Sequence, residues 1–85
     1  MRATLVASGA SCKLRVSKGS KSVMTRPLEL DEEAIHGADA CASTPEMVWT
    51  LLPSGAVLLK VKLWEEDPAM GKMLLGQDIF ILPPM

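Results

Sequence analysis

Strict alternation of hydrophobic and polar residues first appears over residues 12–16. Cys, Leu and Val there share one side of an extended chain, and Lys and Arg share the other. A period of two residues is typical of a strand that buries one face. A turn with Gly19 follows, and residues 21–26 can return beside the first run. The pattern therefore predicts an antiparallel hairpin over residues 12–26.

A second alternating run predicts another hairpin in the C-terminal half. Residues 57–63 place Val and Leu on one face, while Lys60 and Lys62 occupy the other. Before this run, residues 46–52 carry apolar side chains on both faces and end at a Pro-Ser-Gly turn. We therefore expect residues 46–64 to form a hairpin whose second strand faces the core.

Two short β-prone segments, residues 3–7 and 79–82, complete the predicted strands. Residues 31–42 differ, because an acidic run is followed there by small residues, and we expect a short helix or a loop insertion. Five or six short strands predict an all-β fold, a small antiparallel β-sandwich or open barrel. At this length the chain makes a single domain, residues 1–85.

The composition is that of a globular domain. Hydrophobic residues make up 48% of the chain, which is enough for a core and too much for a disordered tail. No apolar run approaches the roughly 18 residues that span a bilayer, and the N-terminus lacks the apolar segment of a signal peptide. We therefore expect a cytoplasmic protein.

The two cysteines, Cys12 and Cys41, have no Cys or His at the spacing of a four-ligand zinc site. Two free thiols are the expectation for a cytosolic chain. The sequence also leaves a disulfide between them open. No cofactor is expected.

Charge is segregated along the chain, although the net charge is only −1. Residues 1–26 carry six cations and no acid, and residues 27–85 carry ten acids against three lysines. This asymmetry predicts a polarised surface if the fold keeps the two halves apart.

The C-terminal half carries motifs that resemble a known family. Trp64-Glu65-Glu66-Asp67 ends the second alternating run; after a loop come Met73-Leu74-Leu75-Gly76 and the apolar run Ile79-Phe80-Ile81. Their order and spacing resemble the C2 domain, a calcium- and lipid-binding sandwich with Trp-Asp-x-Asp, a loop, then Asp-Phe-Leu/Ile-Gly. The resemblance covers about residues 8–82 and implies a C2-like β-sandwich. Because the family domain is longer, we expect a divergent, truncated or incomplete copy.

In the C2 family, loop aspartates bind calcium, which takes six to eight oxygen ligands. The resemblance places Glu65 and Asp67 at two of these positions, while Gly9 and Met73 stand where the family has Asp. Two carboxylates make at most a weak, degenerate calcium site, so we expect calcium-independent binding. The alternative is a solvated acidic loop without a metal.

Some C2 domains bind anionic headgroups through lysines on a concave strand face. The resemblance implies such a lipid-binding surface for Lys13, Arg15, Lys60 and Lys62, provided that their two strands are neighbours in one sheet. Each cation near an anionic leaflet contributes about 1 kcal/mol, so four would give salt-sensitive binding. The alternative is ordinary solvated strand faces on which lysines deter aggregation.

These observations predict a non-catalytic module that docks to an anionic phospholipid membrane surface or to a protein. The alternative is a scaffold or interaction fragment of a larger protein that oligomerises through exposed strand edges. A nucleic-acid partner is not expected, because the three aromatic residues are not interleaved with the basic strand. Catalysis is not expected either, because the single His has no recognisable acid–base partner.

Overall fold

The computed structural model describes residues 1–30, 41, 43–69 and 71–85. All regular elements in these residues are strands, which confirms the all-β prediction for this part of the chain. They are β1 (Arg2–Ser8), β2 (Ser11–Lys18), β3 (Lys21–Met24), β4 (Thr44–Leu51), β5 (Val57–Asp67) and β6 (Gly71–Leu82). The helix or loop expected over residues 31–42 lies, apart from Cys41 itself, outside the described residues.

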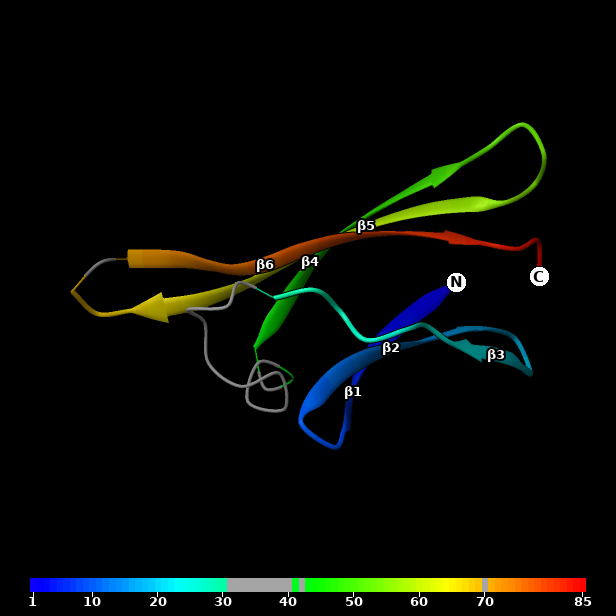
Figure 1. The fold of residues 1–85 in the computed structure, drawn as a ribbon. Coiled ribbons are helices and arrows are strands. Elements are labelled where there is room, and N and C mark those ends of the chain that lie inside the picture. The colour runs from blue at the N-terminus through cyan, green and yellow to red at the C-terminus, as the bar shows by residue number, and fades with distance from the viewer. Residues whose placement is uncertain (31–40, 42, 70) are drawn as a thin grey trace.

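The strands form two antiparallel sheets, ordered β1-β2-β3 and β4-β5-β6. Each sheet is a meander of hairpins, and the second sheet lies across the first (Figure 1). Both predicted hairpins are confirmed, since β2 pairs with β3 and β4 pairs with β5. The last strand is longer than predicted, because it begins at Gly71 and its residues 71–74 pair with the acidic end of β5, where no apolar alternation marks a strand.

A single hydrophobic core contains residues from both sheets. Its most deeply buried members come from the central strand of each sheet: Cys12, Leu14 and Val16 of β2, and Leu59, Val61 and Leu63 of β5. Each of these side chains is at most 1% exposed. Because successive side chains of a strand point to opposite faces, the residues between them lie on an outer face, turned away from the core.

Residues 25–30, which we call the bridging segment, connect the first sheet to the second. The backbone N–H of Thr25 donates to the carbonyl of Leu14, and that of Leu28 donates to the carbonyl of Cys12. The segment therefore first continues the line of β3 beside β2. It then crosses to β6, where its backbone approaches Gly76.

Gly76 is needed because of this crossing. A Cβ at position 76 would lie 2.7 Å from the carbonyl oxygen of Glu29 and 2.8 Å from the Cα of Leu30, both of them backbone atoms. Just before it, a β-bulge leaves Leu75 without a partner, since Leu63 faces Gly76 and Trp64 faces Leu74. The bulge turns Leu75 into the core, where it is 4% exposed.

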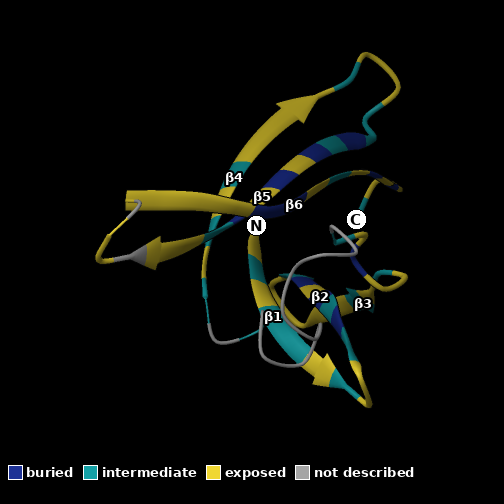
Figure 2. Ribbon diagram, turned by 60° about the vertical axis from the view of Figure 1, so that its left-hand side comes forward, coloured by how far each residue is buried: buried dark blue, intermediate teal, exposed yellow. Residues whose placement is uncertain are grey.

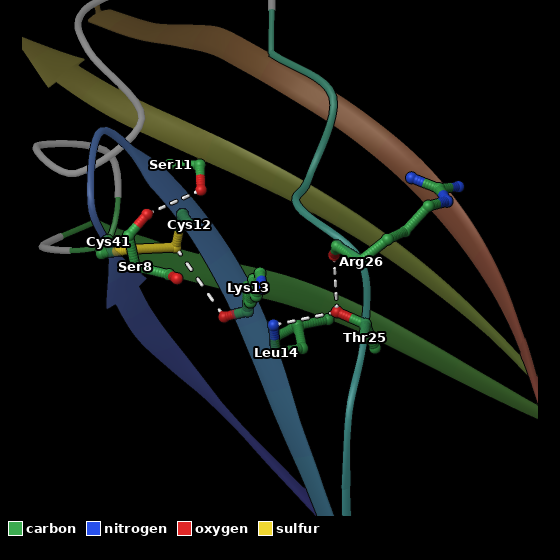
Figure 3. The surroundings of a disulfide bond; sticks show 8 residues. All are labelled: Ser8, Ser11, Cys12, Lys13, Leu14, Thr25, Arg26 and Cys41. Atoms are coloured by element: carbon green, nitrogen blue, oxygen red, sulfur yellow. Dashed lines mark hydrogen bonds between the residues drawn. A yellow bond between two sulfur atoms is a disulfide. The ribbon is translucent and has the colours of Figure 1, made fainter.

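A disulfide joins Cys12 of β2 to Cys41, shortly before β4 begins (Figure 3). The expectation of two free thiols is therefore wrong. The fold brings the two Cα atoms to 5.7 Å, within the usual range for a disulfide, across 29 positions of sequence that no local pattern connects. Disulfides are rare in cytosolic proteins, so this bond argues against the cytoplasmic location expected from the sequence.

Candidate docking surface

The four cations proposed to bind lipid lie in two different sheets. Lys13 and Arg15 belong to β2, and Lys60 and Lys62 belong to β5. Each pair alternates with core residues, so the two pairs occupy the two outer faces. The condition for one four-cation patch, that their strands are neighbours in a sheet, is not met.

The outer face of the first sheet offers little apolar surface beside its cations. Arg15 stands between Thr4 of β1 and Met24 of β3, and Lys13 faces Val6. Met24 is the large apolar side chain exposed there, at 46%. This face has the character of an ordinary solvated sheet surface.

The outer face of the second sheet combines two lysines with exposed aliphatic side chains. Lys60 stands between Val48 of β4 and Ile79 of β6, which are each 53% exposed. The adjacent row ends at Ile81, which is 70% exposed. We call this surface the docking face, and it consists of Val48, Leu58, Lys60, Lys62, Ile79 and Ile81. Figure 2 shows how much of β4, at one side of this sheet, is exposed.

The ammonium groups of the docking face have no acidic partner in the described part of the chain. The residue opposite Lys62 is Glu46, but the Glu46 carboxylate instead accepts a 2.8 Å hydrogen bond from the indole N–H of Trp64. A shallow hollow of about 520 Å³ lies beside Lys60 and Lys62 and reaches Ile79. Two unpaired cations beside aliphatic side chains suit an anionic group with an apolar neighbourhood.

The acidic end of β5 lies beyond β4, on a two-stranded ribbon formed with β6 (Figure 1). Glu65 is exposed there and faces Met73, and the side chain of Asp67 lies outside what the structure describes. Within residues 1–30, 41, 43–69 and 71–85, no three His, Cys, Asp or Glu side chains gather as ligands for a metal. The fold thus adds no described ligand to the weak calcium site expected from the sequence.

An ion pair that the sequence did not suggest ties the bridging segment to β6. The guanidinium of Arg26 donates to both carboxylate oxygens of Asp78, at 2.6 and 2.8 Å, and lies 4.7 Å from the ring centre of Phe80. These hydrogen bonds hold the pKa of Asp78 below its ordinary value against the opposing effect of burial, and the backbone N–H groups of Glu29 and Ile79 lower it further. The sequence held one sign of this ion pair. Asp78 lies two residues before Phe80, so alternation along the strand places its carboxylate on the core-facing side of β6.

Comparisons with protein-family models, with curated proteins and with solved structures found no match for this chain. No helix in the described ranges is long and apolar enough to cross a membrane. The resemblance to the C2 domain thus rests on motif spacing alone, and the docking face is defined by its own geometry.

Proposed function

We propose that this chain is a non-catalytic, C2-like docking module that binds anionic phospholipid surfaces through the docking face, without calcium. One observation supports this above the others: Lys60 and Lys62 stand together, without acidic partners among the described residues, beside exposed Val48, Ile79 and Ile81. Lysines draw such a surface to anionic headgroups, and the aliphatic side chains enter the headgroup boundary.

The choice between the two outer faces follows from their apolar content. The first sheet carries the same number of cations, in Lys13 and Arg15, but exposes only Met24 as a large apolar side chain beside them. Contiguous exposed apolar surface marks interaction sites, whereas isolated lysines on a sheet are usually solvated. The proposal therefore assigns binding to β4-β5-β6, and a docked protein is the competing occupant of the same face.

The double variant Lys60→Gln/Lys62→Gln is expected to bind anionic vesicles at least about 30-fold more weakly than the unmodified chain, because each copy of the chain loses two cations that contribute about 1 kcal/mol each. Co-sedimentation with phosphatidylserine vesicles at low salt, without reductant, measures this. Adding calcium or a chelator should leave binding unchanged.

The matched control is Lys13→Gln/Arg15→Gln, which removes the same charge from the opposite face. It should retain most of the binding, reduced only by the long-range charge effect that salt screens. Equal losses in the two double variants would contradict the assignment to the second sheet. Failure of the unmodified chain to bind at low salt would overturn the membrane proposal and leave the docking face to a protein.

A further inference from the structure

The free edge of the second sheet is formed by β4, which pairs with β5 alone in the part of the chain that the structure describes. Leu52 shows which way its backbone groups point: its N–H donates to Ala56 and its carbonyl accepts from Gly55, both toward β5. Because these groups alternate along an antiparallel strand, even-numbered residues face β5 and odd-numbered residues face outward. Pro45 fits this assignment, since its nitrogen has no proton to donate to the ladder.

Met47, Trp49 and Leu51 therefore present their N–H and C=O groups at an open strand edge. Natural edges are usually protected by charged side chains, proline or bulges, and residues 47–51 contain none of these. Their apolar side chains are also open to solvent: Trp49 is 36% exposed and Leu51 is 76% exposed.

The edge strands β6 and β1 differ from β4 in this respect. β6 carries a bulge and binds the bridging segment through Asp78. β1, an edge of the first sheet, exposes no large apolar side chain along its length.

We propose that two copies of this chain pair β4 with β4, antiparallel, about a twofold axis at Trp49, and so form one continuous six-stranded sheet. In this register Trp49 faces Trp49 of the second copy and Met47 faces its Leu51, so every outward N–H and C=O of these residues gains a partner. The two indoles then form a cross-strand aromatic pair.

The sequence of β4 favours a second copy of the chain as its partner, paired in this register. Glu46, the only charged residue of β4, would face the uncharged Leu52, so no like charges meet. Moving the axis to Val48 would set Leu51 against Pro45, which lacks an N–H, and moving it to Thr50 would set Met47 against Pro53 beyond the strand.

Pairing about this axis has a consequence for the proposed function, on which this step rests. The axis is normal to the sheet, so both docking faces lie on the same side and the dimer presents Lys60 and Lys62 twice. The dimer thus gathers four cations on one face, two from each copy, and two linked sites bind one surface more tightly than either alone.

Sedimentation equilibrium of the unmodified chain without reductant tests the pairing, and we expect the mass of a dimer that dissociates on dilution. Trp49→Lys places two ammonium groups against each other at the axis and should give a monomer. Met73→Lys, an equally charged change at a 42% exposed site on the distant ribbon, should leave the dimer intact. A monomer at every concentration, or a dimer that survives Trp49→Lys, would overturn the proposal.

Cross-linking tests the register without relying on the stability of a charged variant. Trp49→Cys should form an intermolecular disulfide under mild oxidation, whereas Val48→Cys, whose side chain faces Thr50 of the second copy, should not. Preferential cross-linking at position 48 would refute this register.

The vesicle assay separates the two proposals. Lys60→Gln/Lys62→Gln should keep the dimer mass, and Trp49→Lys should weaken vesicle binding about 30-fold by halving the number of cations engaged.

Discussion

We expect reduction of the Cys12–Cys41 disulfide to lower the free energy of unfolding by roughly 3–4 kcal/mol. The bond closes a loop over 29 positions, and opening it returns that conformational freedom to the unfolded chain. A domain of 85 residues has about 4–13 kcal/mol of stability in total, so the loss is a large fraction. We expect the reduced chain to be marginally folded at room temperature.

Urea unfolding followed by tryptophan fluorescence, with and without reductant, measures this effect. The variant Cys12→Ala/Cys41→Ala is the control, because its unfolding midpoint should not respond to reductant. Coincident curves for the unmodified chain in the two conditions would show that the bond does not stabilise the fold. Alanine suits the control better than serine, because Cys12 is fully buried and a hydroxyl group costs more to bury than a methyl group.

Replacing Asp78 with asparagine is expected to destabilise the folded chain by roughly 1.5–3 kcal/mol at neutral pH, the usual value of a hydrogen bond to a charged group. The Asp78 side chain is 8% exposed and Arg26 is 53% exposed, so the pair lies at the boundary of the core. The substitution removes the negative charge of Asp78 and so weakens its hydrogen bonds to Arg26 and Glu29, which hold the bridging segment against β6.

The same ion pair predicts how stability depends on pH. The folded-state pKa of Asp78 lies below its ordinary value near 3.8, so the unfolded chain takes up this proton first as the pH falls. The contribution is therefore complete above about pH 5 and is lost as the pH drops through 3.8 toward the lower folded-state pKa.

Unfolding free energies measured from neutral pH into the acid range test this sign. Asp78→Asn should be less sensitive to acid than the unmodified chain, so that the two curves converge at low pH. Glu66→Gln, at an exposed site, is the matched control and should run parallel to the unmodified chain. A constant offset between Asp78→Asn and the unmodified chain at all pH values would contradict the linkage.

Local patterns predicted the strands and the core well. The side chains of Leu59 and Val61 are buried as expected, because alternation within one strand already states which residues share a face. The bulge at Leu75 and the extension of β6 from Gly71 were not predictable, since they depend on pairing with β5 rather than on periodicity.

Contacts between distant segments account for most of what the sequence did not reveal. Lys13 and Lys60 lie in hairpins of similar pattern, and alternation does not say which hairpins share a sheet. The Arg26–Asp78 pair spans 52 positions, and the disulfide spans 29. The docking face follows only once β4, β5 and β6 are known to be neighbours, because its apolar residues come from all three strands.

Tryptophan quenching by spin-labelled anionic vesicles tests the central claim, that the outer face of the second sheet meets the membrane. Trp64 lies on that face, where it binds Glu46, and Trp49 lies on the opposite side of the same sheet, paired with the core residue Leu59. The variants Trp49→Phe and Trp64→Phe leave one reporter each. We predict strong quenching of Trp64 and weak quenching of Trp49, and equal or stronger quenching of Trp49 would contradict the account.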